Sequence, residues 1–234
     1  MVWDWIPRNL DLIGNLLVVH VVLALIPVVV GLVLAVPIGW LASRSRVLRG
    51  ILVPAASVLY TIPSLAVFIV LPAILGTQIL DPLNVVVALS IYTVALLVRS
   101  VADALAAVPA LVVAAATAMG YRPAKRFVSV ELPLAVPVLI AGLRVAAVSN
   151  ISLVSVGALI GVGGLGRMFT EGYQRDFPTE IITGIVLIVA LALVVDGLLV
   201  LLGRAITPWT RLEGKGRAVA EPEATPGTTE VSAA

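Results

Sequence analysis

Residues Ala114 to Pro133 read AAATAMGYRPAKRFVSVELP, and they lie between long apolar segments. The alanine-rich start favours a helix, because alanine has the highest helix propensity. Gly120 ends that helix, and a basic, amphipathic turn follows it as far as Leu132 and Pro133. A helix–glycine–helix hairpin that presents cations at a membrane surface is typical of a docking element, so we expect another protein to bind here.

The composition places the rest of the chain in a membrane. Of 234 residues, 61% are hydrophobic and 12% are charged, and the mean hydropathy is +1.16. A soluble domain of this length could not bury that much apolar surface, so the sequence predicts an all-α integral membrane protein in contact with lipid. The net charge of +2 argues against a nucleic-acid partner, and the absence of cysteine excludes disulfides and thiolate metal sites. We expect no cofactor and no metal.

Apolar runs predict five transmembrane helices within a membrane domain at 12–206, since about 20 apolar residues span a bilayer. The predicted spans lie at about 12–43, 51–75, 83–100, 133–160 and 181–203. Pro63 should kink the second span, which a membrane tolerates where the freed carbonyls face protein or a water-filled path. We expect residues 1–11 to form a retained, amphipathic extracytoplasmic segment, and residues 207–234 to form a polar, disordered cytoplasmic tail.

The segment Ala104 to Tyr121 has no charged residue, so hydropathy alone would make it a sixth span. Eight of its residues are alanine, which contributes little to membrane insertion. A span here would also leave only a few residues for the reversal near Arg99. We therefore predict an interfacial or cytoplasmic helix.

The distribution of lysine and arginine predicts the orientation. With five spans, ten cations lie on one side: Arg44, Arg46, Arg49, Arg122, Lys125, Arg126, Arg204, Arg211, Lys215 and Arg217. Three lie on the other side: Arg8, Arg167 and Arg175. The excess of cations on cytoplasmic loops then predicts an outside N-terminus, a cytoplasmic hairpin and a cytoplasmic C-terminus.

The hairpin resembles the EAA loop of ABC importer permeases, in which an alanine-rich triplet, a glycine, an aliphatic residue and Leu-Pro recur at fixed spacing. The matching positions are Ala114, Ala115, Ala116, Gly120, Val130, Leu132 and Pro133. Further stretches resemble the permease subunits of glycine betaine/carnitine/choline osmoprotectant importers, and together they cover about residues 20–204. These stretches are Thr61 to Ala66, Gly142 to Arg144, Ala158 to Gly166 and Leu191 to Asp196.

The resemblance implies a five-helix permease of the type I ABC importer fold in the bacterial inner membrane. It implies a second permease, identical or a sister chain, a cytoplasmic ATPase and an extracytoplasmic substrate-binding protein. The chain has no phosphate-binding loop, so ATP hydrolysis must come from the partner, and we expect no enzyme activity here. The residues expected to couple to the ATPase are Ala114, Ala115, Ala116, Gly120, Arg122, Lys125, Arg126, Val130, Leu132 and Pro133.

One position departs from the family pattern. Ala114 stands where the loop usually has glutamate, so an ion pair made by that carboxylate is missing here. Arg122, Lys125 and Arg126 are candidates to supply the electrostatic part of docking instead.

The candidate residues of a translocation path or gate are Tyr60, Pro63, Ser64, Tyr92, Arg144 and Asn150. Arg144 and Asp196 are charges in or near apolar spans, so each is either a path residue or part of an ion pair, or it reaches the interface from a helix end. Arg99 and Asp103 fit a surface pair at the end of the third span. His20 has no second histidine to share a metal with, and we predict a hydrogen-bonded structural role.

The predicted function is solute import rather than catalysis. The leading hypothesis is a permease for compatible solutes such as glycine betaine, choline, carnitine or proline betaine. The alternatives are a permease for another small solute, such as methionine or a sulfonate, and a membrane enzyme or scaffold. The glycine-rich run at Gly161 to Gly166 is predicted to be an outer turn that contacts the binding protein.

Overall fold

A computed structural model describes residues 2–209, and these residues form helices and turns with no strand. The predicted tail from residue 210 onward lies outside the described residues. The helices are α1 (Trp5–Arg8), α2 (Leu10–Arg44), α3 (Arg46–Thr61), α4 (Ser64–Leu75), α5 (Pro82–Ala106), α6 (Ala110–Ala118), α7 (Pro123–Arg126), α8 (Leu132–Gly157), α9 (Arg167–Gln174) and α10 (Pro178–Ile206). A π-helical turn, η1 (Phe127–Glu131), and a 3₁₀ turn, η2 (Ala158–Ile160), flank α8.

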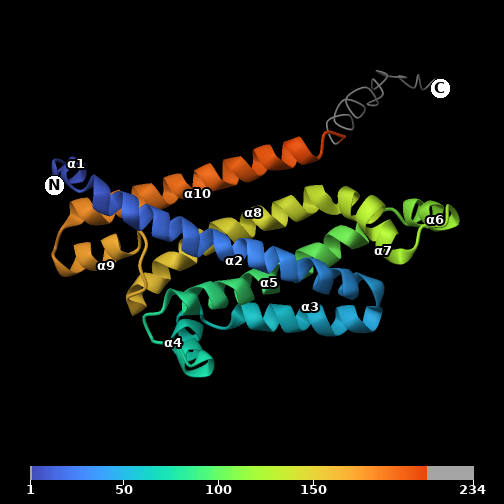
Figure 1. The fold of residues 1–234 in the computed structure, drawn as a ribbon, viewed down its shortest axis with the longest axis horizontal. Coiled ribbons are helices and arrows are strands. Elements are labelled where there is room, and N and C mark those ends of the chain that lie inside the picture. The colour runs from blue at the N-terminus through green and yellow to red at the C-terminus, as the bar shows by residue number, and fades with distance from the viewer. Residues whose placement is uncertain (1, 210–234) are drawn as a thin grey trace, which may run out of the picture.

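Long apolar helices run side by side along the molecule (Figure 1). Four helical segments are long and apolar enough to cross a bilayer, and the pair α3 and α4 makes up to five if it counts as one bent span. The predicted all-α membrane fold with five spans is therefore confirmed. One end of the bundle, called here the hairpin end, holds α6, α7, the α2–α3 turn and the end of α10, whereas α1 and α9 lie at the opposite end (Figure 1).

The first span is one helix of 35 residues that continues through Pro27 and Pro37. At about 1.5 Å per residue it is longer than the hydrocarbon core of a bilayer. It packs closely on α5, because Gly31 lies against Thr93 and Gly39 lies against Val101. A Cβ atom at Gly39 would come within 2.5 Å of the Val101 Cβ atom, so this crossing requires glycine.

The second span is bent as expected. The axes of α3 and α4 differ by 99°, and the break falls at Ile62 and Pro63. Pro63 has no N–H group, and it disfavours helical geometry at the preceding residue. Ile62 accordingly has extended backbone angles.

Helix ends differ from the predicted bounds in two places. Helix α5 continues to Ala106, past the predicted end of the third span near residue 100, and the predicted helix at 104–121 is instead divided by Pro109 into the end of α5 and the nine-residue α6. Helical backbone also runs without a break from Pro123, before the predicted start of the fourth span at Pro133. In η1 the Leu132 N–H bonds to the Phe127 carbonyl, five residues back, and this wider turn accommodates the Pro133 ring.

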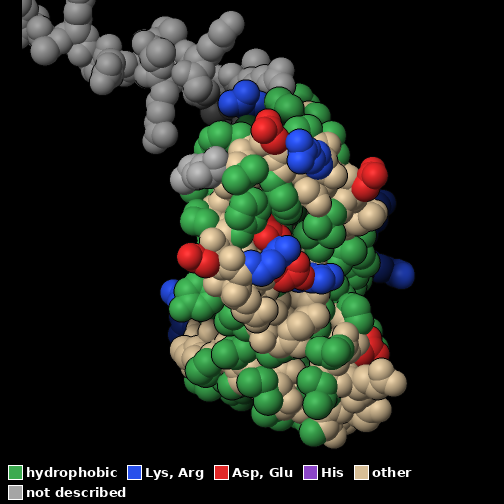
Figure 2. All heavy atoms as spheres, turned by 90° about the vertical axis from the view of Figure 1, so that its left-hand side faces the viewer, with side chains coloured by type: hydrophobic (Ala, Val, Ile, Leu, Met, Phe, Trp, Pro, Cys, Tyr) green, Lys and Arg blue, Asp and Glu red, His purple; other side chains and the backbone are tan. Residues whose placement is uncertain are grey.

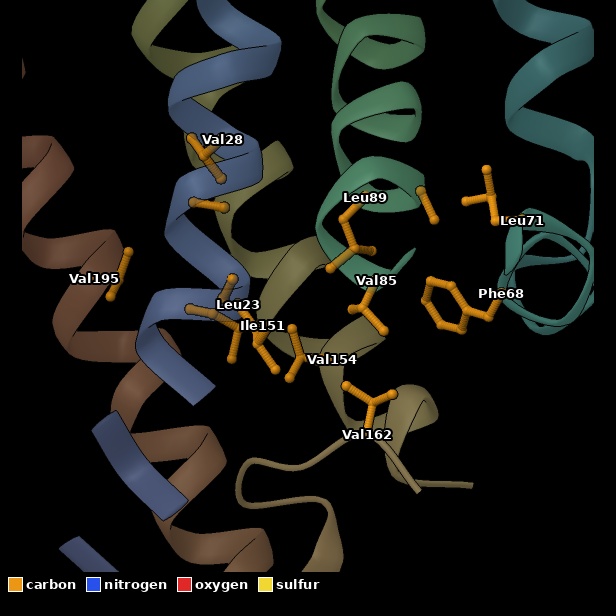
Figure 3. Close-up of a cluster of buried hydrophobic side chains, with 13 residues drawn as sticks. Leu23, Val28, Phe68, Leu71, Val85, Leu89, Ile151, Val154, Val162 and Val195 are labelled. Carbon is orange, nitrogen blue, oxygen red and sulfur yellow. The ribbon is translucent and has the colours of Figure 1, made fainter. Parts of the chain in front are cut away.

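The main apolar core lies where α2, α4, α5 and α8 meet (Figure 3). Its fully buried members include Phe68 of α4, Val85 and Leu89 of α5, and Ile151 of α8. Val195 of α10 also joins this cluster, but few residues of α10 are buried. Exposed apolar side chains on α10 suit contact with lipid or with another membrane subunit.

Candidate functional site

The hairpin at one end of the bundle is closed by a complete Schellman motif. The Tyr121 N–H donates to the Ala116 carbonyl at 3.1 Å, and the Gly120 N–H donates to the Thr117 carbonyl at 3.0 Å. Gly120 has a φ angle of +83°, a left-handed conformation that glycine adopts without strain. The reversal predicted at Gly120 is therefore present, and it projects α6 from the end of the membrane helices (Figure 1).

The exposed face of α6 is apolar, a feature that the sequence reasoning missed. Leu111 is 81% exposed and Met119 is 70% exposed, with exposed Ala115 between them at a spacing of four residues. This spacing places all three on one helical face, called here the α6 stripe. Ala114 is exposed beside it, whereas Ala116 is buried against the hairpin. Exposed Leu111 and Met119 flanking small residues suit a contact surface for another protein.

The basic residues of the hairpin fall into two groups. Arg122 and Lys125 are exposed, and the Lys125 ammonium lies 5.1 Å from the centre of the Tyr121 ring. Arg126 was predicted to be a surface cation, but only 12% of its side chain is exposed. It points inward and donates to Glu131 at 2.6 Å and to the Thr117 hydroxyl at 2.5 Å.

Glu131 is the residue that sequence reasoning did not single out. Its side chain is 8% exposed and lies between two guanidinium groups, those of Arg126 and Arg44. The Arg44 Nη2 atom lies 3.2 and 3.3 Å from the two Glu131 carboxylate oxygens. The sequence carries one signal for it: Glu131 is the one acidic residue between Asp103 and Glu171, and it follows the basic residues of the hairpin. The carboxylate ties the hairpin to the end of α2.

The aliphatic and Leu-Pro positions of the hairpin face the membrane domain. Val130 and Leu132 are half-buried, and Leu132 packs on the cluster formed by α2, α5 and α8. Pro133 follows η1 at the first turn of α8. These residues therefore position the hairpin, whereas the α6 stripe, Arg122 and Lys125 remain available to a partner.

The bend between α3 and α4 gathers the predicted path residues Tyr60, Pro63, Ser64 and Tyr92. The Tyr92 hydroxyl donates to the Ile62 carbonyl at 2.5 Å, and this bond satisfies an acceptor that the break in the helix leaves free. The Tyr60 and Tyr92 rings meet edge to face, 5.9 Å apart. Tyr92 is 4% exposed and Tyr60 is 42% exposed, so Tyr60 is the aromatic ring that a solute could reach.

The other two predicted path residues tie helices together. Arg144 of α8 and Asp196 of α10 form a bidentate ion pair with distances of 2.6 and 2.7 Å. Asn150 is 2% exposed and donates to the Ala24 carbonyl and to the Thr93 hydroxyl, joining α8 to α2 and α5. In this conformation Asn150 is enclosed by protein and lines no open path.

His20 has the predicted structural role. It is fully buried, its Nδ1 accepts a hydrogen bond from the Leu165 N–H at 3.1 Å, and its Nε2 lies 2.9 Å from the Ile151 carbonyl. A backbone N–H can only donate, so the proton of the neutral ring is on Nε2. His20 thereby fastens the glycine-rich turn at Gly161 to Gly166 to α2 and α8.

The end opposite the hairpin mixes acidic, basic and apolar side chains (Figure 2). Arg167 and Glu171 pair along α9 at 2.6 Å, and Arg175 reaches the buried Glu180 at 2.5 Å. The positive charge is thus largely compensated here. On the hairpin end, by contrast, Arg122 and Lys125 make no ion pair with the described residues.

Comparison with known proteins gives one consistent family. The model of the family described as "Binding-protein-dependent transport system inner membrane component" matches residues 18–210. The choline transport system permease protein OpuBB of Bacillus subtilis is 32% identical over 189 residues, which cover 81% of this chain and 86% of that protein. The osmoprotectant import permease protein OsmW of Salmonella typhimurium is 34% identical over 203 residues, which cover 86% of this chain and 94% of that protein.

A solved structure confirms the architecture. A chain of the MetNI methionine ABC transporter, in an inward-facing conformation, superposes with a TM-score of 0.75 at 22% identity. The match covers 88% of this chain and 100% of that chain. It shows that the fold is that of a type I ABC importer permease. The chain therefore belongs to the family of inner membrane components of binding-protein-dependent transport systems.

Proposed function

We propose that this chain is the permease subunit of an ATP-driven importer for quaternary ammonium compatible solutes. Two permeases, either identical or sister chains, form the path, a cytoplasmic ATPase supplies the energy, and an extracytoplasmic binding protein delivers the solute. The observation that carries the proposal is the hairpin at one end of the membrane bundle. It presents an apolar stripe together with the exposed cations Arg122 and Lys125, for which the described residues provide no ion pair.

The hairpin end is the cytoplasmic end in this proposal. The described cations at that end include Arg44, Arg46, Arg49, Arg122 and Lys125, and an excess of cations is typical of cytoplasmic loops. The N-terminus and α9 then lie outside, where the binding protein docks. Within the glycine-rich turn at Gly161 to Gly166, Gly161 is exposed at that end, whereas Gly164 and Gly166 are buried.

Docking to the ATPase rests on the α6 stripe rather than on a carboxylate. Ala114 occupies the position at which the family pattern usually has glutamate, and its small side chain leaves Leu111 and Met119 as the prominent contacts. Arg122 and Lys125 add positive charge beside the stripe. The ATPase is therefore expected to present an apolar groove with acidic residues along its rim.

The substrate class follows from what the relatives are named for. Those names include choline, glycine betaine, carnitine and ergothioneine, and each of these compounds carries a trimethylammonium group. The shared chemistry is therefore the quaternary amine. The accessible Tyr60 ring fits this class, because aromatic faces attract quaternary ammonium groups.

Reconstitution in liposomes with the ATPase and the binding protein tests the proposal. The assay compares ATP-dependent uptake of glycine betaine, choline, carnitine and proline betaine with uptake of methionine and a sulfonate. Uptake of at least one quaternary amine, and of neither other solute, is the expected result. Uptake of methionine or the sulfonate alone would refute the substrate class, and no ATP-dependent uptake of any solute would refute the transport function.

A further inference from the structure

A cavity of about 400 Å³ opens between α3, α5 and α8, on the hairpin side of the bend. It is lined by Ser57, Tyr60, Ala95, Leu96, Arg99, Ser100, Gly142 and Val145. Its volume falls within the range of about 300–1,000 Å³ that is typical of small-molecule sites. The lining combines the phenol ring of Tyr60, two serine hydroxyl groups and one charge, that of Arg99.

Arg99 lies about two turns inside the end of α5. Because α5 continues to Ala106, seven helical residues separate Arg99 from the end of the helix, a rise of about 10 Å. Its side chain is nevertheless 66% exposed. An exposed charge at this depth is favourable only where it faces water or a polar ligand rather than lipid, and the cavity provides that surrounding.

The Arg99 guanidinium is only weakly engaged within the described chain. Its Nε atom lies 3.8 Å from the nearer Asp103 oxygen, which is beyond hydrogen-bond distance. The other Asp103 oxygen is held by Arg49 at 2.5 Å. The planar donors of Arg99 therefore remain free to bind a carboxylate in the bidentate manner that suits guanidinium groups.

The aromatic and basic groups are aligned along one face of α5. Tyr92 and Arg99 are seven residues apart, so they lie on the same face of α5, about 10 Å apart along its axis. The Tyr92 ring contacts the ring of Tyr60. Both Tyr60 and Arg99 line the cavity. The lining thus offers an aromatic face for a quaternary ammonium group and a guanidinium for a carboxylate at separate positions.

We propose that this cavity is a transient binding site for zwitterionic betaines on the translocation path, with Tyr60 holding the quaternary ammonium group and Arg99 the carboxylate. This inference rests on the proposed function and goes further, because it assigns a preference among quaternary amines. Solutes with a carboxylate, such as glycine betaine and carnitine, gain the Arg99 contact. Choline has no carboxylate and therefore does not gain this contact.

The test compares initial rates of ATP-dependent uptake of glycine betaine and choline in proteoliposomes, each at a saturating concentration of the loaded binding protein. Arg99→Gln is expected to lower the ratio of glycine betaine uptake to choline uptake about tenfold, whereas Arg99→Lys should lower it less. Arg46→Gln removes an exposed arginine outside the cavity and serves as the matched control. Tyr60→Leu should slow uptake of both solutes, and Tyr60→Phe should preserve it because the ring remains.

An unchanged ratio in Arg99→Gln, an equal fall in both rates, or full retention of glycine betaine uptake would overturn this inference while leaving the proposed function intact. A wild-type protein that carries choline but no carboxylate-bearing amine would overturn it as well. A wild-type protein that carries no quaternary amine would instead refute the proposed function. Choline uptake by Arg99→Gln at the wild-type rate also shows that the variant is folded.

Discussion

Replacing Glu131 with glutamine tests whether this carboxylate positions the hairpin. Glutamine keeps the size of the side chain and removes its charge. Arg126 and Arg44 then face each other across a neutral amide, with 12% and 28% of their side chains exposed. The hairpin should lose its fixed position relative to α2, because the shared counter-charge is what holds the two arginines together.

The contacts set the size of the effect. Removing one partner of a fully buried pair costs about 3–5 kcal/mol, and exposed pairs contribute about 0–1 kcal/mol. The Arg126–Glu131 contact is nearly buried at 2.6 Å, whereas Arg44 is partly solvated and its contact is longer, at 3.2 Å. The expected cost of Glu131→Gln lies between these limits, at about 2 kcal/mol. Such a cost shifts the equilibrium toward a released hairpin by about thirtyfold.

Distance measurements between spin labels provide the assay, since the chain has no cysteine. The two labels replace exposed residues, Arg46 at the start of α3 and Ala124 in α7. In Glu131→Gln the distance distribution should broaden, and uptake per ATP hydrolysed should fall while the assembled complex is retained. Arg122→Gln removes an exposed hairpin cation and should leave the distribution narrow. A narrow distribution and wild-type coupling in Glu131→Gln would refute the positioning role.

Three further predictions concern the hairpin, the topology and the core. Gly120→Val should insert and assemble but couple ATP hydrolysis poorly to uptake, because a left-handed backbone costs an ordinary residue about 1–2 kcal/mol; wild-type coupling would contradict this. Single cysteines at Gln78 and Ser129 should react with an impermeant thiol reagent from opposite sides of the membrane, and labelling from the same side would contradict the orientation. His20→Leu leaves the Leu165 N–H without its acceptor, so the free energy of unfolding should fall by about 1–3 kcal/mol, measured as a lower unfolding temperature in detergent. Substitution of an exposed residue, Val18→Leu, should leave that temperature unchanged.

The spans were predictable because bilayer thickness fixes the length of an apolar helix. Local chemistry also placed the breaks at Pro63 and Gly120, since proline removes a donor and glycine permits a left-handed turn. The continuation of α5 to Ala106 was not predicted, because charged residues such as Arg99 and Asp103 are typical of the end of an apolar helix. In the structure both residues lie within the last turns of α5, and Asp103 pairs with Arg49.

The contacts within the candidate site were less predictable, because their partners are far apart in the sequence. Glu131 is 87 residues from Arg44, and Asn150 is 126 residues from Ala24. No local pattern reveals such pairs, so Arg126 was predicted to be a docking cation and Asn150 a path residue. Pro133 was expected to begin a helix, but the helical backbone continues through it. The π-helical turn that accommodates Pro133 depends on backbone geometry, and no recognisable sequence motif predicts it.

If the hairpin is the surface through which an ATPase drives this permease, the α6 stripe must touch the ATPase. Site-specific photocrosslinking measures this contact, with a benzophenone amino acid at Met119 on the α6 stripe and, as the control, at Leu159, which is 64% exposed near the opposite end. We expect Met119 to crosslink to the ATPase in the assembled complex and Leu159 not to do so. Crosslinking of the ATPase from Leu159, or no crosslinking from Met119 in a complex that still hydrolyses ATP, would rule out this coupling role of the hairpin.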